Sequence, residues 1–281
     1  MGLIKAAKEA IGSTLGDQWK EAIRCENMTN DILMMRRTTE SGVISNGSTI
    51  VVEPGQCAII VDNGRVIDAT AEDGMYILDT SSTPSFFAGQ FGETFKEMWQ
   101  RFTYNGVSSK QQEVYFFNIK EILENRFGTA IPIPFQDWSH PLMNEMTNTM
   151  SPLRLEIKCF GKYTFRIIDP ALFMTRISGT NEEYKKDELV EDMKSEIIAI
   201  LQNIINELGN EEHKVPVLEL PSQTDEIRKI IDERECDKNI RARGIEILSF
   251  MIESVTLTDE SEQKIDHYEY STNAQLQKTR M

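Results

Sequence analysis

Basic residues are scarce relative to acidic ones in this sequence of 281 residues. Its 30 Lys and Arg stand against 45 Asp and Glu, which gives a formal net charge of -15. A nucleic-acid partner requires a basic surface that neutralises phosphates, so this balance excludes a general nucleic-acid-binding function. The same balance argues against a general electrostatic attraction to anionic lipid, so any membrane contact has to come from a local segment.

The sequence is also poor in cysteine and has no long apolar run. Its cysteines form no CxxC pair: Cys25, Cys57, Cys159 and Cys236. Two of them lie in apolar strand patterns, which is typical of free thiols in a reducing compartment. No run approaches the ~20 apolar residues that cross a bilayer, and Lys5, Lys8 and Glu9 interrupt the first twenty residues, which excludes a signal peptide. We therefore predict a cytoplasmic protein.

Residues arranged for catalysis or metal binding are few. The histidines His140, His213 and His267 are far apart, and none has a second ligand three or four residues away. Ser139 and His140 are adjacent, yet neighbours in a Pro-flanked loop rarely face each other as nucleophile and base. The sequence has no Walker loop, G-x-S-x-G or G-x-G-x-x-G motif. We expect no enzyme activity, metal or cofactor; a site assembled from distant loops is the alternative.

The stretch 48–79 consists of short Val- and Ile-rich runs separated by turn signals. Pro54-Gly55 and Asn63-Gly64 each favour a tight turn, and Glu72-Asp73-Gly74 supplies a third. The runs are too short for helices, so we predict an antiparallel meander. All four residues over 58–61 are apolar, although successive residues of a strand point to opposite faces. This pattern indicates a strand covered on both faces. We also predict strands over 32–37 and 113–119, and an edge segment over 129–138 because it holds two prolines.

The segment 2–24 follows the pattern of an amphipathic helix, with apolar residues at spacings of three and four. The residues that we predict to bind a membrane are Leu3, Ile4, Ala7, Ile11, Leu15 and Trp19. Two interpretations stay open. The apolar stripe enters the acyl boundary with Trp19 at headgroup level, or it packs on the protein's own sheet. The aromatic-rich segment 86–104 also has two interpretations: its rings lie in the core, or they contact lipid.

The segment 153–168 alternates apolar and polar residues, which predicts a long strand with one buried and one solvated face. After residue 168 the spacing of the apolar residues changes from that of a strand to that of a helix. The new pattern predicts a short helix over 171–177, a long helix over 184–208 and a charged helix from Ser222 to Arg243, and a strand follows over 245–257. A polar helix then opens at Thr258-Asp259 and runs to the end of the sequence. This order of elements predicts an α+β fold.

The charged helix alternates in sign and has few apolar anchors. We therefore predict that its charges pair with those of a neighbouring subunit. The residues of this predicted oligomer interface are Arg228, Asp232, Arg234, Glu235, Lys238 and Arg241.

These motifs resemble the SPFH superfamily of stomatin, prohibitin, flotillin and HflK/HflC proteins, also called Band 7. The stretch VVEPGQCAIIVDNGRVID, followed by GMYIL, is similar to the opening of that domain, and GIEILSFMIESVTL fits its later part. More narrowly, NIKEILENRFGTAIPIPFQD followed by LRLEIKCFGKYTFRIIDPALF looks like the YdjI-like bacterial branch. The resemblance covers about residues 1–265. It divides the chain into an N-terminal helix (1–26), a β-rich subdomain (27–150), an α/β subdomain (151–258) and the start of a C-terminal helix (259–281).

The resemblance implies a non-enzymatic membrane-associated scaffold that assembles into large homo-oligomers. In the bacterial branch it also implies a link to envelope stress, with phage-shock-type membrane proteins as partners. Many relatives carry a membrane anchor and a C-terminal tail. Neither pattern is found in these 281 residues, so we expect attachment to the cytoplasmic face of the membrane through the N-terminal helix or a partner. The alternative is a soluble oligomeric adaptor that binds protein and packs this helix internally.

Overall fold

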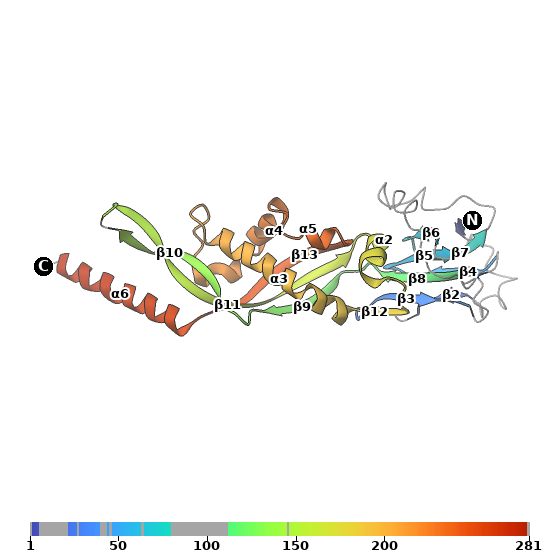
Figure 1. The fold of residues 1–281 in the computed structure, drawn as a ribbon, viewed down its shortest axis with the longest axis horizontal. Helices are drawn as coiled ribbons and strands as arrows, with labels where there is room; N and C mark the ends of the chain where they lie inside the picture. Colours follow the sequence, from blue (N-terminus) through green and yellow to red (C-terminus); the bar gives the residue numbers. More distant parts are fainter. Residues whose placement is uncertain are drawn as a thin grey trace. The chain divides into compact units, whose positions relative to one another are not determined.

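The computed structural model describes residues 2–5, 22–26, 28–39, 44, 47–62, 65–79, 112–144 and 146–279. Its strands and helices make an α+β fold, as predicted (Figure 1). The chain forms two compact units, which are described separately. Unit 1 comprises Met1–Ile122, Arg166–Glu191 and Arg241–Glu246, and unit 2 comprises Leu123–Phe165, Asp192–Ile240 and Ile247–Met281. The predicted boundary between residues 150 and 151 falls inside a strand of unit 2.

Unit 1 contains two sheets that enclose a hydrophobic core. The first has the order β1 (Gly2–Lys5), β7 (Gly74–Asp79), β4 (Thr49–Val52) and β2 (Ile23–Arg24). The second has the order β12 (Glu183–Lys185), β3 (Ile32–Arg37), β8 (Gln112–Asn118), β5 (Gln56–Asp62) and β6 (Arg65–Thr70). Ile50 and Tyr76 from the first sheet belong to the same buried cluster as Ile60 and Phe116 from the second. The core therefore lies between the sheets.

The strands predicted over 48–79 are present, but the meander is wrong. β5 pairs with β6 as an antiparallel hairpin, whereas β4 pairs with β7 in the other sheet. The chain changes sheet after β4, through a turn in which Gly55 has a φ of 79°. β5 is buried at every position but the last, which agrees with a strand covered on both faces. The connections before β5 and after β6 thus run between the two sheets, while the β5–β6 hairpin stays within one.

The second face of the larger sheet is covered by helix α2 (Pro170–Phe173). Asp169 caps this helix, because its carboxylate accepts hydrogen bonds from the backbone N–H groups of Ala171 and Leu172. The Phe173 ring packs edge-on against Phe117 of β8 at 6.2 Å between centroids. A π-helical turn, η4 (Met174–Ser178), continues it. The predicted helix over 184–208 begins only at Lys186, because Glu183–Lys185 pairs with β3.

Unit 2 is built on one four-stranded sheet with helices on one side of it. The strands are β9 (Ile122–Gly128), β10 (Ile133–Asn144), β11 (Thr149–Ile167) and β13 (Ile245–Leu257). Both β9 and β13 pair with β11, while β10 pairs with β11 at the edge, where the exposed Pro134 is tolerated. The helices are α3 (Lys186–Leu208), η5 (Val217–Ser222), α4 (Thr224–Glu233), α5 (Lys238–Arg241) and α6 (Asp259–Thr279).

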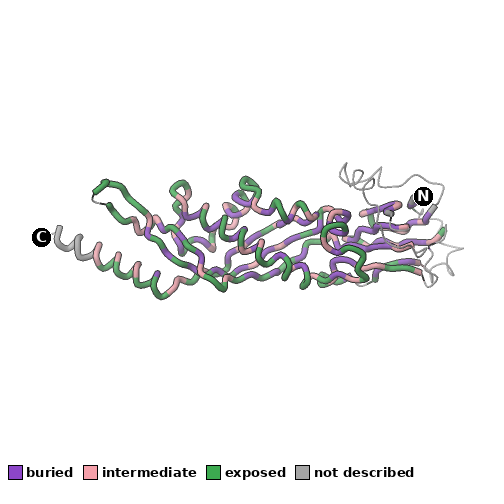
Figure 2. Tube along the Cα trace, in the orientation of Figure 1, coloured by how far each residue is buried: buried purple, intermediate pink, exposed green. Residues whose placement is uncertain are grey.

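The alternation predicted along β11 is confirmed. Leu153, Leu155, Ile157, Cys159, Tyr163, Phe165 and Ile167 are all buried. The residues between them up to Phe160 are exposed, so the strand has one covered and one open face (Figure 2). Gly161 is required by a close approach: a Cβ there would lie 2.1 Å from the Met251 carbonyl oxygen of β13. The buried face also carries the stacked rings of Phe127 and Phe250, 4.6 Å apart.

Two predicted helices require correction. The charged helix is broken between Glu233 and Lys238, where Glu235 has a φ of 48°, and Ser222 does not cap it but donates to the Glu219 carbonyl oxygen. The N-terminal helix is wrong at its described ends, since Gly2–Lys5 and Ile23–Arg24 are strands. Residues 6–21 of that helix and the aromatic segment 86–104 lie outside the described residues. No helix in the described part of the chain is long and apolar enough to cross a bilayer.

Candidate functional site

Leu3 is the one predicted membrane-binding residue whose side chain the structure describes, and it lies in the core. Its side chain is 5% exposed, and its backbone N–H donates to the Asp68 carboxylate at 2.6 Å. Ile4 pairs through its backbone with Ile77 of β7. Leu3 is therefore not available to lipid. Ala7, Ile11, Leu15 and Trp19 lie outside the described residues, and lipid contact by them stays a prediction.

The predicted interface charges all have partners within their own chain. The ion pairs are Arg228–Asp232 (3.0 Å), Arg234–Glu207 (2.6 Å), Lys238–Glu235 (3.4 Å) and Arg241–Glu246 (3.2 Å). Arg228 also donates to the carbonyl oxygens of Ile247 and Leu248, which ties α4 to β13. These contacts stabilise the fold around α4 and α5. A role between subunits stays a prediction.

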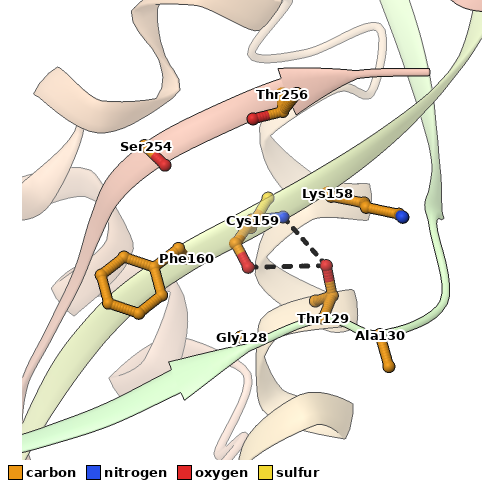
Figure 3. Close-up of a pocket in the computed structure, with 8 residues that line it drawn as sticks. All are labelled: Gly128, Thr129, Ala130, Lys158, Cys159, Phe160, Ser254 and Thr256. Atoms are coloured by element: carbon orange, nitrogen blue, oxygen red, sulfur yellow. Dashed lines mark hydrogen bonds between the residues drawn. The ribbon is translucent and has the colours of Figure 1, made fainter. Parts of the chain in front are cut away.

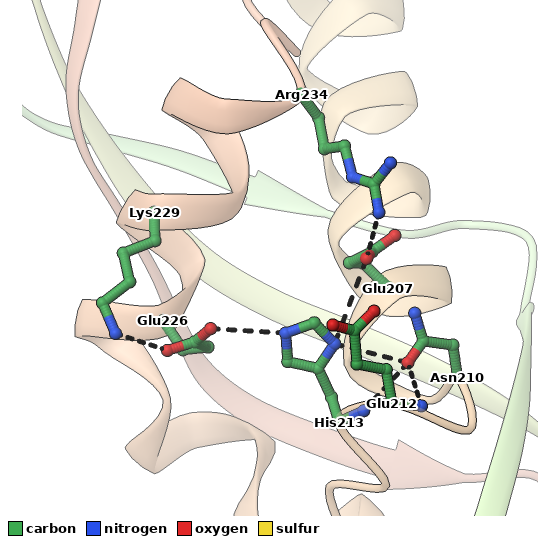
Figure 4. A network of polar contacts seen from close by, with 7 residues as sticks. All are labelled: Glu207, Asn210, Glu212, His213, Glu226, Lys229 and Arg234. Atoms are coloured by element: carbon green, nitrogen blue, oxygen red, sulfur yellow. Dashed lines mark hydrogen bonds and ion pairs between the residues drawn. The ribbon is translucent and has the colours of Figure 1, made fainter.

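A polar network joins the turn after α3 to the start of α4 (Figure 4). The His213 ring lies between two carboxylates, with Nε2 3.3 Å from Glu226 and Nδ1 4.0 Å from Glu207. Glu212 adds a third acidic group within reach of the same ring. Sequence spacing could not reveal this grouping, because Glu226 follows His213 by thirteen residues and only the turn brings them together.

Cations already balance two of the three carboxylates of this network, those of Glu207 and Glu226. Arg234 lies 2.6 Å from Glu207, and Lys229 lies 2.9 Å from Glu226. The hydrogen bond from Lys229 is the largest cause that lowers the pKa of Glu226 below its usual range. The Asn210 side chain accepts from the backbone N–H groups of Glu212 and His213 and so fixes the turn. Apart from the Glu212 carboxylate, the groups drawn in Figure 4 are thus paired with one another, as expected of a structural role.

Ser139 and His140 are in contact, but not in the arrangement of a nucleophile and its base. The Ser139 hydroxyl lies 3.0 Å from His140 Nδ1, and Asp137 contacts both residues, at 2.5 Å and 2.6 Å. The same ring nitrogen, Nδ1, contacts both the serine hydroxyl and the Asp137 carboxylate. In a hydrolase triad the histidine contacts the serine through one ring nitrogen and the carboxylate through the other. Asp137 therefore holds the serine proton rather than orienting a base. The cluster fixes the irregularity between Asp137 and Leu142 in β10.

The same cluster contacts helix α6. The Tyr268 ring packs edge-on against the His140 ring at 5.2 Å, and Glu269 approaches His140 Nε2 to 4.0 Å. Beyond the irregularity, β10 and β11 continue as a two-stranded hairpin whose end is exposed (Figure 2). That end carries large exposed apolar side chains: Leu142, Met143, Met146 and Met150. Exposed methionines are common at interaction surfaces because the side chain adapts to different partners.

The outward side of the unit 2 sheet carries a shallow hollow of ≈ 420 Å³ (Figure 3). We call this surface the open face and define it by Gly128, Ala130, Lys158, Phe160, Ser254 and Thr256. Lys158 and Phe160 stand on β11, and the neighbouring strands place small residues on either side of them. The hollow forms because those small side chains leave space around a long and a flat one. The helices of unit 2 lie behind the sheet in this view.

The side chains of the open face are suited to binding a partner rather than to catalysis. Cys159 points to the covered side, and burial raises the pKa of its thiol to about 12, so it remains protonated. Lys158 and Arg154 form no ion pair with any residue that the structure describes. By contrast, Lys162 on the same strand pairs with Glu124 at 2.9 Å and Glu253 at 3.4 Å. The open face therefore presents a cation without a partner beside an aromatic ring that is 39% exposed.

The sequence contained one signal for this surface. Phe160 occupies a solvent position of β11, where the alternation otherwise places charged or polar residues. An aromatic residue at an outward position of a strand indicates a contact surface, since it exposes a large apolar area to water. The hollow itself depends on Gly128 and Ser254, which belong to other strands, and so could not be foreseen.

Comparison with known proteins gives two findings. The family model described as SPFH domain-Band 7 family matches residues 34–273. The chain is also 27% identical over 251 residues to YdjI, an uncharacterized protein of Bacillus subtilis (strain 168). That alignment covers 89% of this chain and 68% of the relative. Both agree with the resemblance seen in the sequence motifs.

Proposed function

Because this chain belongs to the SPFH domain-Band 7 family, we propose that it is a non-enzymatic peripheral membrane scaffold that assembles into large homo-oligomers. The match of the family model to residues 34–273 carries this proposal, since the family consists in general of membrane-associated scaffolds. We place the protein at the cytoplasmic face of the membrane. Its proposed role is in the response to membrane stress, together with phage-shock-type membrane proteins.

Features of the described residues support a scaffold over an enzyme. Asp137, Ser139 and His140 contact one another, as do His213, Glu226 and Lys229, and the Ser139–His140 contact lacks the geometry of a nucleophile and its base. The exposed apolar end of the β10–β11 hairpin and the open face are surfaces suited to partners. These are the properties of a protein that binds rather than transforms.

Assembly is tested by measuring the mass of the full-length chain in solution. Sedimentation velocity or mass photometry is expected to give species many times the 32.2 kDa of a single chain. A single species at 32.2 kDa over the micromolar range would contradict the scaffold.

Membrane binding is tested by flotation of the full-length protein with vesicles. The structure argues against deleting residues 1–24, because that deletion also removes Leu3 and β1 from the core. Point variants Leu15→Ser and Trp19→Ser avoid this, and Leu218→Ser, at an exposed leucine of η5, is the matched control. We expect the first two to reduce flotation several-fold and the control to leave it unchanged. Equal flotation of all four proteins would remove the N-terminal segment as the lipid contact.

The position of Leu3 favours a second candidate function. Since the first residues of the chain pack into the core, a soluble oligomeric adaptor that binds protein is the alternative. Trp19 fluorescence separates the two in a chain with Trp99 and Trp138 replaced by Phe. Trp138→Phe is a mild change, because no hydrogen-bond partner for the buried indole N–H lies among the described residues. A lipid-dependent blue shift supports the membrane scaffold, whereas blue emission that lipid does not change supports the adaptor.

A further inference from the structure

We propose that the open face of unit 2 binds helix α6 of a second copy of this chain, with Lys158 against Asp266 and Phe160 against Tyr270. The inference rests on the proposed self-assembly and names the surfaces that would carry it.

The first surface is incomplete as it stands in one chain. Lys158 has no ion pair with a described residue, although the net charge of the chain is -15 and carboxylates are abundant. Phe160 is 39% exposed, with the Arg126 guanidinium 5.9 Å from its ring centroid. Small neighbours on β9 and β13 leave the hollow around both side chains open (Figure 3). An occupant with a carboxylate next to an aromatic ring would satisfy both.

The second surface offers that combination. Glu262, Asp266 and Tyr270 follow one another at intervals of four residues and so form one stripe of α6, which we call the outer stripe. All three are exposed, Tyr270 to 77%, and neither carboxylate has an ion pair among the described residues. The opposite side of the helix faces its own chain, where Ser261 is buried and Tyr268 packs against His140. The outer stripe therefore points away from its own chain.

The two surfaces have matching spacings. Four residues of α-helix span about 6 Å, and two residues of a strand span about 6.8 Å. Asp266 can thus reach Lys158 while Tyr270 packs on Phe160. One like-charge contact accompanies this alignment: Glu156, exposed next to Lys158 on β11, would lie near Glu262. The alignment therefore relies on the ion pair and the aromatic contact.

Such a contact joins different surfaces on the two copies. A heterologous contact repeats from copy to copy and gives a ring if the rotation closes, or a filament if it does not. This agrees with a large homo-oligomer, because each added chain presents a new open face and a new outer stripe.

The test is a charge exchange in the full-length chain. Lys158→Glu and Asp266→Lys each place like charges together, so each variant is expected to sediment as small species when the wild type assembles. A 1:1 mixture of the two variants restores opposite charges at both kinds of contact. We expect the mixture, and the double variant K158E/D266K, to recover at least half of the wild-type assembly. Glu156→Gln removes the like-charge contact and is expected to strengthen assembly.

Lys194→Glu is the control, since Lys194 is an exposed lysine of unit 2 on helix α3 and belongs to neither proposed surface. It is expected to assemble like the wild type. If K158E and D266K assemble normally, or if their mixture does not recover, the contact proposed here is wrong. If K158E assembles but loses vesicle flotation, the open face contacts lipid instead, which also overturns the proposal. A monomeric wild type would refute the proposed function itself and is thereby distinguished from these outcomes.

Discussion

Strands β5 and β11 differ in how many of their faces are buried. β5 in unit 1 is buried at six consecutive positions, because its sheet is covered on both sides. β11 in unit 2 alternates buried and exposed residues along most of its length, because helices cover only one side of its sheet. A strand covered on both sides contributes to the core alone. A strand with an open face can also carry residues for a partner, which is why the proposed contact lies in unit 2.

The largest expected effect on stability comes from comparing the two faces of β11 with each other. Phe165→Ala removes a ring that is fully buried, whereas Phe160→Ala removes the exposed ring of the open face. We expect the free energy of unfolding to fall by about 3–5 kcal/mol for the first and by less than about 1 kcal/mol for the second. Urea denaturation of both full-length variants measures the difference. Similar losses would mean that both sides of β11 are covered.

In β5 the same kind of test should show no such asymmetry. Ile59 and Ile60 point to opposite faces, and both are fully buried. Ile59→Ala and Ile60→Ala are each expected to lower the free energy of unfolding by about 2–5 kcal/mol. A conservative Ile→Val change at either position serves as the control and should cost about 1 kcal/mol. If one of the two alanine variants is tolerated, one face of β5 is open.

Two glycines of the unit 2 sheet sharpen the comparison on a smaller scale. A Cβ at Gly161 would lie 2.1 Å from the Met251 carbonyl oxygen and 2.7 Å from the Phe127 ring, while a Cβ at Gly128 meets only the Phe160 side chain at 3.6 Å. Gly161→Ala is therefore expected to destabilise the protein by about 1–3 kcal/mol. Gly128→Ala should stay within about 0.5 kcal/mol. Thermal unfolding of the pair, compared with wild type, would disprove this packing if the order were reversed.

The smallest effect concerns the ion pair of Glu226 and Lys229 at the surface of unit 2. The pKa of Glu226 is lowered mainly by its hydrogen bond with Lys229, so the pair favours the folded state above the unfolded pKa of the carboxyl group. That contribution is lost as the pH falls through the lower, folded pKa. Lys229→Met should move the pKa of Glu226 upward in an NMR titration. Glu260, whose pKa is lowered by Lys264 in α6, is the internal control and should not change.

The sequence predicted the periodic elements of this fold well. The strand over 32–37 and that over 245–257 match β3 and β13 residue for residue, and the parity of β11 is correct throughout its predicted length. These predictions depend on local backbone geometry, because side chains alternate along any strand. Where the period was interrupted, as at Glu235 in the charged helix, the prediction extended one element too far.

The candidate surfaces were predicted less completely. The outward position of Phe160 could be read from the alternation, and Asp266 and Tyr270 from the last helix. The neighbours that make the hollow come from strands more than ninety residues apart in sequence, such as Gly128 and Ser254. No local pattern links residues at that separation.

By itself, then, the sequence determined the α+β class, the family, and the two faces of its longest strand, β11, since each follows from short-range periodicity or motif order. Only the tertiary structure decided that β4 and β7 leave the hairpin of β5 and β6 for another sheet, and that Leu3 joins a strand instead of a helix. Leu3 bonds to Asp68, sixty-five residues away. Such pairings are chosen by the burial and hydrogen bonding that the whole chain makes available, and these outweigh a helical pattern in a short segment.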